Sequence, residues 1–373
     1  MQIKDRGILN RGEPGTRRAL TTFATITTLT DGSLLASYRV GSKKDCDDET
    51  IELRRSRDGG KTWSEPTSPF IDTVGGRRGS LKVVYVTPLG ESHLMASSLW
   101  IDREAYPGKP LFNDQTEGCL PMELLVADSH DQGQTWTPWR IVAVPDDVGP
   151  PSLTSPVLKM PSGRLAVSIE TNKNYDDASK WYQRVAYVYS DDNGQTWGAP
   201  VTVSQDPAAR IFNWDQRAGV CPDGRVVTFS WTYDRETTNY LNVHRRLSSD
   251  EGATWTEPED LGFTDQPSRP AILPDGRMVV AWVDRFRTQS IRARLAKQPD
   301  APFPAETEVV LYELKNAAKS VAGEGHTGDL LAEMGVWNFG LPYAEVLPDG
   351  DVLVTYYEGT AECMQASWVR LAL

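Results

Sequence analysis

The chain has 373 residues, a net charge of −12 and a hydrophobic content of 39%. That much apolar sequence suffices for a core, and a closed all-β architecture of this length often forms one domain. The acidic balance argues against nucleic acid or an anionic membrane as the main partner. No run of 18 apolar residues is present in the sequence, so no membrane span is expected.

Cysteines and histidines are few and scattered. The four cysteines form no C-x-x-C pair, which favours free thiols in a reducing compartment over a disulfide framework. The four histidines lack the spacing of a zinc site, so no metal is expected, and nothing in the sequence implies an organic cofactor. The first residues lack the apolar region of a signal peptide, which predicts a cytoplasmic protein unless a signal has been removed.

Six segments along the chain have the pattern of a strand, a tight turn and a second strand. The turn glycine of each supplies a positive φ, and β-branched or aromatic residues flank it. The segments are 28–38, 86–97, 159–169, 220–230, 272–282 and 346–356, with turn glycines Gly32, Gly90, Gly163, Gly224, Gly276 and Gly350. Their spacing leaves room for one four-stranded sheet per segment.

A second repeat, Ser-x-Asp-x-Gly-x-Thr-Trp, follows the first in four of these units. Its copies are 56–63, 129–136, 190–197 and 248–255, and a degenerate version lies near 290–300. The Asp can accept turn N–H groups and the Trp can pack between sheets, so we expect a structural role for Asp58, Asp131, Asp192 and Asp250.

This repeat resembles the Asp box of the sialidase superfamily, and the resemblance covers the whole chain. It implies an all-β fold, a six-bladed β-propeller formed by residues 1–373 as one domain, with the Asp boxes on the face away from the active site. The last blade runs out of chain after the strand near 367–373. We therefore expect the N-terminal segment 2–9 to add its outer strand, which leaves no free sheet edge.

The longest polar connections fall on the face opposite the Asp boxes, where loops on a rigid scaffold carry function. Their aromatic and charged residues predict a sugar-binding crater, and the alternative is a solvated polar rim. The residues are Trp100, Trp181, Trp214, Trp231, Trp337, Asp102, Arg235, Asp284 and Arg287.

The resemblance implies particular catalytic residues. The stretch 34–45 is similar to the sialidase segment that carries an Arg and the acid/base Asp, which here are Arg39 and Asp45. Asp47, Asp48 and Glu49 are alternatives. Asp215, nine residues before Gly224, matches the Glu that polarises the sialidase tyrosine nucleophile.

The nucleophile itself has no match in strict register, where Leu341 stands. Tyr343 lies two residues further on, hence on the same face of a regular strand, and is our candidate. Tyr356 and Tyr357, at the end of the next strand, compete with it.

The arginine triad of sialidases is where the sequence departs from the family. Its first Arg registers near Thr22, with Arg17 and Arg18 upstream as substitutes. The second registers on Trp231, with Arg235 nearby, and the third near Thr288 or Gln289, beside Arg287. A bidentate clamp on a carboxylate tolerates little displacement, so strict sialic acid specificity does not follow.

We therefore expect a sialidase-like exo-glycoside hydrolase acting on a terminal, possibly acidic, sugar. Asp45, Asp215 and Tyr343 would be catalytic, and Arg39, Arg18, Trp231, Arg235, Arg287, Trp100 and Trp214 would bind substrate. The alternatives are a related propeller glycosidase or polysaccharide lyase on neutral or uronic sugars, and a non-catalytic carbohydrate-binding propeller. The sequence does not indicate an oligomeric state.

Overall fold

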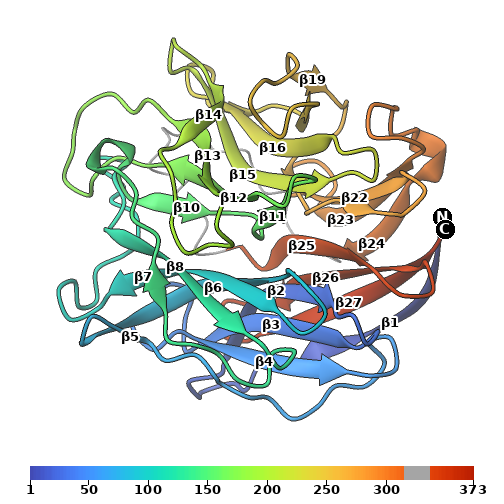
Figure 1. Ribbon diagram of the computed structural model, residues 1–373, viewed down its shortest axis with the longest axis horizontal. Coiled ribbons are helices and arrows are strands. Elements are labelled where there is room, and N and C mark those ends of the chain that lie inside the picture. Colours follow the sequence, from blue (N-terminus) through green and yellow to red (C-terminus); the bar gives the residue numbers. More distant parts are fainter. Residues whose placement is uncertain (315–336) are drawn as a thin grey trace.

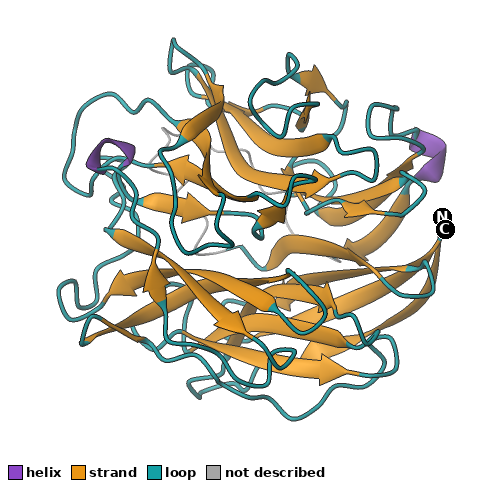
Figure 2. Cartoon of the chain, viewed as in Figure 1, coloured by secondary structure: helices purple, strands orange, loops and turns teal. Residues whose placement is uncertain are grey.

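The structure is a computed structural model that describes residues 1–314 and 337–373. Its regular structure is β-strand throughout, apart from two single-turn 3-10 segments, η1 (Asp146–Val148) and η2 (Ala305–Thr307), as Figure 2 shows. The all-β class predicted from the sequence is confirmed. In the described part of the chain, no helix has the length and apolar character needed to cross a membrane.

The strands form five sheets, and the largest joins two antiparallel groups, so that six groups follow one another along the chain (Figure 1). The first group is β2 (Leu20–Thr28), β3 (Leu34–Gly41) and β4 (Thr50–Ser56). The second is β5 (Thr73–Val74), β6 (Arg77–Pro88), β7 (Leu94–Asp102), β8 (Met122–Ser129) and β9 (Arg140–Ile141). The third is β10 (Pro151–Leu153), β11 (Leu158–Lys159), β12 (Leu165–Thr171), β13 (Arg184–Ser190) and β14 (Val201–Gln205).

The fourth group is β15 (Ile211–Val220), β16 (Val226–Asp234), β17 (Asn239–Tyr240), β18 (His244–Ser248) and β19 (Glu259–Asp260). The fifth is β20 (Gln266–Pro267), β21 (Ala271–Ile272), β22 (Met278–Asp284), β23 (Ser290–Ala296) and β24 (Val309–Glu313). The sixth is β25 (Phe339–Val346), β26 (Val352–Gly359), β27 (Met364–Ala372) and β1 (Gln2–Asn10).

The two ends of the chain meet in the sixth group. β1 pairs antiparallel with β27, from Gln2 opposite Ala372 to Asn10 opposite Ala366. The two termini accordingly lie side by side in Figure 1. A parallel bridge between Leu20 and Met364 then joins the sixth group to the first. The N-terminal segment thus covers the edge of β27, as a sheet edge requires.

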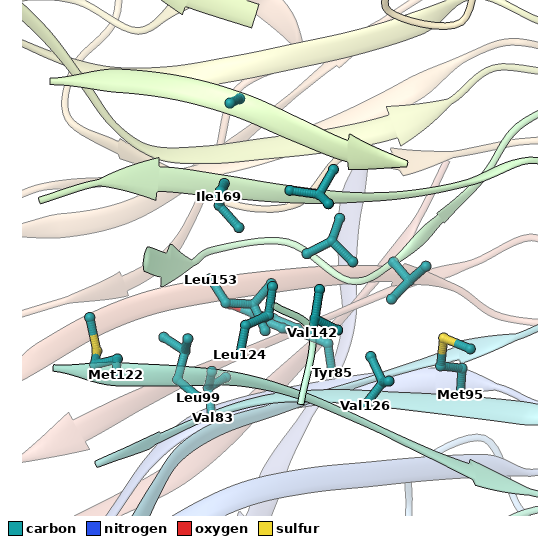
Figure 3. Packing of buried hydrophobic residues seen from close by; sticks show 14 of the residues in the cluster. Val83, Tyr85, Met95, Leu99, Met122, Leu124, Val126, Val142, Leu153 and Ile169 are labelled. Atoms are coloured by element: carbon teal, nitrogen blue, oxygen red, sulfur yellow. The ribbon is translucent and has the colours of Figure 1, made fainter. Parts of the chain in front are cut away.

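The core lies between neighbouring groups rather than inside any one sheet. Alternate residues of a strand point to opposite faces, so β12 sends Val167 to the second group and Ala166 to the fourth. Figure 3 shows the cluster that packs between the second and third groups. Five further clusters join the other consecutive pairs, and the one around Tyr38 and Trp368 joins the first group to the sixth.

The hairpin turns follow the sequence prediction with one exception. Five turn glycines, Gly32, Gly163, Gly224, Gly276 and Gly350, have φ between 78° and 90°. Gly90 is not among the glycines with positive φ, so the prediction for it was wrong. Its turn is closed by a hydrogen bond from Leu89 N–H to His93 O, which places Gly90 at the second position of the turn instead of the fourth.

The four Asp boxes are hydrogen-bonded turns. In the second, Asp131 Oδ1 accepts the N–H groups of Gln134 and Thr135 at 3.0 and 2.9 Å, and the hydroxyl of Ser129 at 2.8 Å. The bonds from Thr135 contribute most to holding the pKa of Asp131 down at about 2. The box tryptophans Trp63, Trp136, Trp197 and Trp255 each pack against a hydrophobic cluster.

Asp131→Ala is expected to lower the free energy of unfolding by about 1 kcal/mol near neutral pH, because the turn loses hydrogen bonds to a charged acceptor that is largely exposed. A carboxyl whose pKa is depressed on folding stabilises above its unfolded pKa of about 4. The difference between variant and wild type should therefore shrink as the pH falls toward about 2.

Urea unfolding across that pH range measures the difference. Asp191→Ala is the matched control, since this exposed residue at a variable position of the third box makes only a surface pair with Arg164. A loss for Asp131→Ala that does not depend on pH would contradict the role of the ionised carboxylate.

Candidate functional site

One cavity of about 800 Å³ collects residues from all six strand groups. Its charged members are Arg39, Lys44, Asp45, Lys82, Asp114, Glu170, Asp215 and Arg285. Its aromatic members are Phe23, Tyr85, Phe112, Tyr175, Trp181, Trp214, Trp231, Trp337 and Tyr357. A concave site of this size, with an aromatic lining and a few convergent polar groups, is typical of a small-molecule site.

The first strands of three groups are bulged where they reach this cavity. Phe23 in β2, Asp215 in β15 and Leu341 in β25 have φ values of 52°, 45° and 48°. Each lies within a register shift against the next strand, and all three line the cavity. A bulge redirects a side chain out of the regular alternation, and positive φ in non-glycine residues is a strained state that clusters at functional sites.

Asp45 lies among cations. Its Oδ1 is 2.8 Å from both Lys82 Nζ and Arg103 Nη2, and its Oδ2 accepts the N–H of Leu111. Burial alone would raise the pKa of Asp45, but the attraction of Lys82 and Arg103 outweighs it and holds that pKa far below its usual range. A carboxylate in this setting is ionised at neutral pH, which argues against the general-acid role expected for Asp45.

Two further carboxyl groups, Glu170 on β12 and Asp215 on β15, face the cavity. Glu170 Oε1 accepts the N–H of Gln216 at 2.9 Å and lies 3.2 Å from Thr154 Oγ1. Asp215 Oδ1 is 3.1 Å from Arg217 Nη2, and its Oδ2 accepts from Gln266. Burial, followed by the charge of Asp215, raises the pKa of Glu170 to about 8. At neutral pH Glu170 is therefore protonated, whereas Asp45 is ionised.

Tyr357, at the end of β26, has two cations beside its hydroxyl. Lys44 Nζ donates to Tyr357 Oη at 3.2 Å and also bonds the carbonyl of Trp337. Burial would raise the pKa of Tyr357, but Lys44 and Arg285 together lower it. Arg285 lies 4.0 Å from the ring centroid of Trp337 and donates to Gln266 Oε1 at 3.0 Å. These groups favour negative charge on this side of the cavity.

The wall formed by the third, fourth and sixth groups is aromatic. Trp214 stacks on Tyr233 with ring centroids 5.0 Å apart, and Trp231 stacks on Tyr240 at 4.7 Å. Trp181 lies 6.2 Å from Trp214. Each indole is thus held by a second ring behind it, which gives the cavity a rigid apolar surface suited to the flat face of a sugar or another ring.

Five of the ten residues given a catalytic or substrate-binding role line the cavity, namely Asp45, Asp215, Arg39, Trp214 and Trp231. Of the other predicted crater residues, Trp181 and Trp337 line it, whereas Asp102 and Asp284 do not. Arg39 is nevertheless paired, with its Nε 3.2 Å from Glu49 Oε1. Five others, Tyr343, Arg18, Arg235, Arg287 and Trp100, are not among the lining residues. The expected convergence of all these side chains on one crater is therefore only partly present in the structure.

The bulge in β25 explains the position of Tyr343. The register shift lies between Gly340 and Tyr343, so the alternation that would have put Tyr343 on the same side as Leu341 is broken. Leu341 lines the cavity, whereas Tyr343 packs in the hydrophobic cluster, with its ring centroid 6.2 Å from that of Tyr85. Burial raises the pKa of Tyr343 well above its usual value, which does not suit a nucleophile.

Three of the other four residues have partners elsewhere, and the fourth is exposed. Trp100 is buried between the first and second groups and donates to Asp72 O at 2.7 Å. Arg18 pairs with Glu52 and Arg235 with Glu117. The Arg287 side chain is exposed. Trp100 lies within β7 and the three arginines lie outside the strands, so the strand pattern alone could not indicate which of these side chains would find such a partner.

Four residues of the cavity were not predicted from the sequence, namely Glu170, Lys44, Lys82 and Arg285. Tyr357 was named only as an alternative to Tyr343 for the nucleophile. Glu170 and Arg285 stand where a second strand ends and a long polar connection begins, which is the one signal that could have found them. Within residues 1–314 and 337–373, no group of three or more His, Cys, Asp or Glu is arranged to hold a metal ion. The four cysteines are free thiols.

Comparison with known proteins shows which families and sequences this chain is similar to. The BNR/Asp-box repeat family model matches residues 54–65, which contain the whole of the first Asp box. A sialidase from Micromonospora viridifaciens is 28% identical over 240 residues, a match that covers 62% of this chain and 35% of that relative. The chain thus corresponds to little more than a third of the length of this curated relative.

Solved structures share the fold. A protein of unknown function from Dyadobacter fermentans DSM 18053 is 18% identical with a TM-score of 0.71, and the match covers 99% of both chains. The intramolecular trans-sialidase from Ruminococcus gnavus is 14% identical with a TM-score of 0.66 and 96% coverage of both chains. Together with the four Asp boxes, these matches support a relationship to the sialidase superfamily.

The lowered pKa of Tyr357 can be measured by ultraviolet titration of the tyrosines. We expect one tyrosine of the wild type to ionise below the usual value of about 10, and this step to be absent from Tyr357→Phe. Lys44→Met should move it to higher pH, because the nearer cation is lost. Tyr343→Phe, which removes a tyrosine with raised pKa, should leave the early step in place. An early step that survives in Tyr357→Phe would contradict the assignment.

Proposed function

We propose that the six strand groups are the blades of a six-bladed β-propeller that forms a single domain. Two observations support closure of the ring. Hydrophobic clusters join every consecutive pair of groups, including the first and the sixth. The N-terminal strand β1 completes the sixth group by pairing with β27. The cavity, to which all six groups contribute, then lies at one end of the central axis.

We infer that this propeller is a glycoside hydrolase of the sialidase type, acting on a terminal sugar. The observation that carries the inference is a single cavity that combines a neutral carboxyl group, an ionised carboxylate and a tyrosine of lowered pKa with an indole wall. Cleavage of a glycosidic bond needs two positioned groups on either side of that bond, and a tyrosine nucleophile is an accepted variant of this scheme.

Tyr357 takes the role of nucleophile in this proposal, in place of Tyr343. Lys44 and Arg285 stabilise the phenolate of Tyr357, whose oxygen attacks the anomeric carbon of the sugar. The same two cations attract a negative group on the substrate, so a terminal acidic sugar is favoured over a neutral one. Trp214 and Trp231 supply the surface on which the ring stacks.

The substrate need not be a sialic acid. At the register positions of two triad arginines the chain has Thr22 and Trp231, both of which line the cavity. Two arginines, Arg39 and Arg285, line it as well. Arg39 is paired with Glu49, and Arg285 Nη1 lies 4.0 Å from Asp265 Oδ2. A carboxylate would therefore be bound mainly by Lys44 and Arg285, an arrangement equally suited to a uronic acid.

A polysaccharide lyase on uronic sugars is the second candidate, and the Tyr357 site itself favours it. Elimination needs a base for the C5 proton and a cation that neutralises the adjacent carboxylate. Tyr357 and the pair formed by Lys44 and Arg285 fit those two requirements. Hydrolysis and elimination differ in their products, so one experiment separates them.

Incubation of the protein in water enriched in oxygen-18, with a panel of glycans ending in sialic, uronic or neutral sugars, tests the proposal by mass spectrometry of the products. We expect release of one acidic sugar carrying the isotope at its reducing end. Tyr357→Phe should lower the rate by about 10²-fold or more, the order expected for loss of one reacting group. The exposed Tyr182 provides the matched control, Tyr182→Phe, with unchanged rate.

Each other outcome has a distinct meaning. A product with a new double bond and no isotope would replace hydrolysis by elimination. Binding of a glycan without any release would leave only the carbohydrate-binding propeller. Release that is unaffected in Tyr357→Phe would overturn the role of Tyr357 while keeping the hydrolase.

A further inference from the structure

Glu170 is a buried acid at the edge of the cavity. It stands near the end of β12, is 5% exposed and belongs to the lining residues. The two hydrogen bonds of its side chain, with Gln216 N–H and Thr154 Oγ1, both involve Oε1. Neither partner carries a charge, so nothing in direct contact with Glu170 balances a carboxylate at this position.

The cation next to Glu170 is Arg217, and it is paired with Asp215. Arg217 is 4% exposed, and its Nη2 donates to Asp215 Oδ1 at 3.1 Å. Its Nη1 donates to Tyr85 Oη at 2.8 Å and to Thr154 O. Asp215 Oδ2 also accepts from Gln266. Both oxygens of Asp215 are thus bonded, one of them to a guanidinium, as an ionised carboxylate requires.

The charge balance leaves a proton on Glu170. The charged and titratable groups that face it are Asp215 and Arg217 from β15 and Tyr85 from β6. One guanidinium balances one carboxylate, and a second ionised carboxyl in the same buried space would have no counterion. Burial and the charge of Asp215, which raise the pKa of Glu170 to about 8, agree with this count.

The other acids of the site do not offer a proton. Asp45 is bonded to Lys82 and Arg103 and is ionised. Asp265 carries a raised pKa of about 7, caused mainly by burial, but it is fully buried and is not a lining residue. Of Asp45, Asp215 and Glu170, three carboxyl groups that line the cavity, Glu170 is therefore the one that combines a neutral form with access to a bound substrate.

We propose that Glu170 is the catalytic acid of this site, the group that protonates the leaving oxygen of a bound glycoside. The inference rests on the proposed hydrolase. As the phenolate of Tyr357 forms a bond to the anomeric carbon, the bond from that carbon to the glycosidic oxygen breaks. Its electron pair stays on the oxygen, which takes the proton of Glu170 and leaves as an alcohol. Water then attacks the same carbon, the bond to Tyr357 breaks, and the proton of the water returns to Glu170.

Glu170→Gln tests this assignment on activity. The variant should cleave a glycoside with an alkyl or sugar leaving group about 10²- to 10⁴-fold more slowly, the usual contribution of a general acid. An aryl glycoside with an acidic phenol needs little protonation, so its cleavage should suffer much less. The wild-type rate should fall as the pH rises through about 8, and this limb should vanish in the variant.

Two further variants serve as comparisons. Asp45→Asn should keep the alkaline limb, because Asp45 supplies no proton. Glu251→Gln, on an Asp-box turn where this side chain bonds Ser162, should match the wild type in rate and profile. Equal losses on alkyl and aryl glycosides in Glu170→Gln, or an alkaline limb that disappears in Asp45→Asn instead, would overturn the assignment.

A stability measurement tests the protonation state without any substrate. A carboxyl whose pKa is raised on folding stabilises most below its unfolded pKa of about 4.3, and this contribution is lost as the pH rises through the folded value. Wild-type stability should therefore fall between about pH 5 and pH 8 relative to Glu170→Gln. Parallel curves would overturn the inference. A wild type that cleaves no glycoside, with diverging curves, would overturn the proposed hydrolase and with it the catalytic role of Glu170, while keeping the proton on this carboxyl group.

Discussion

The bulge in the first strand of three groups is the constraint on which the cavity depends. A regular strand would send alternate residues into the packing between sheets, and the end facing the cavity would carry little beyond backbone. The bulges at Phe23, Asp215 and Leu341 turn one side chain per strand toward the cavity instead. The strain of a positive φ is offset by the packing on both sides of each strand, which holds the kinked backbone in place.

The charged side chains around the cavity are arranged so that its carboxyl groups differ in protonation. Asp45 has two cations in contact and Asp215 has one, whereas Glu170 has none. Separation of acidities by environment is how one site holds both a proton donor and anionic groups at neutral pH. Lys44 and Arg285 apply the same principle to Tyr357, whose phenolate they favour. The chemistry proposed for the protein follows from this difference between otherwise similar side chains.

The repeats made much of the fold predictable. The Asp boxes and turn glycines depend on short-range backbone geometry, which the local sequence specifies, so the β class and the hairpins could be placed in advance. Asp215 could be found because it keeps a fixed distance from a hairpin turn, and Arg39 and Asp45 because the stretch 34–45 resembles a sialidase segment. Tyr343 could not be placed correctly, because the pattern of a strand does not reveal a bulge that breaks its alternation.

The remaining site residues depend on contacts between distant parts of the chain. Nothing near Glu170 in the sequence indicates that Arg217 would be engaged by Asp215, and Lys82 meets Asp45 only when two groups pack together. Likewise, Arg235 does not line the cavity and instead forms an ion pair with Glu117, which comes from another loop. Such pairings are set by the tertiary structure, so residue type and spacing alone could not rank these charged side chains.

A crystal structure of the Glu170→Gln variant with an intact glycoside bound is the most direct test of this account. We predict that the glycosidic oxygen lies within hydrogen-bond distance of the side-chain amide at position 170, with the anomeric carbon facing the Tyr357 hydroxyl. The negative group of the sugar should contact Lys44 and Arg285, and its ring should stack on Trp214 or Trp231. A glycoside bound with its scissile bond remote from position 170, or bound outside this cavity, would contradict the account.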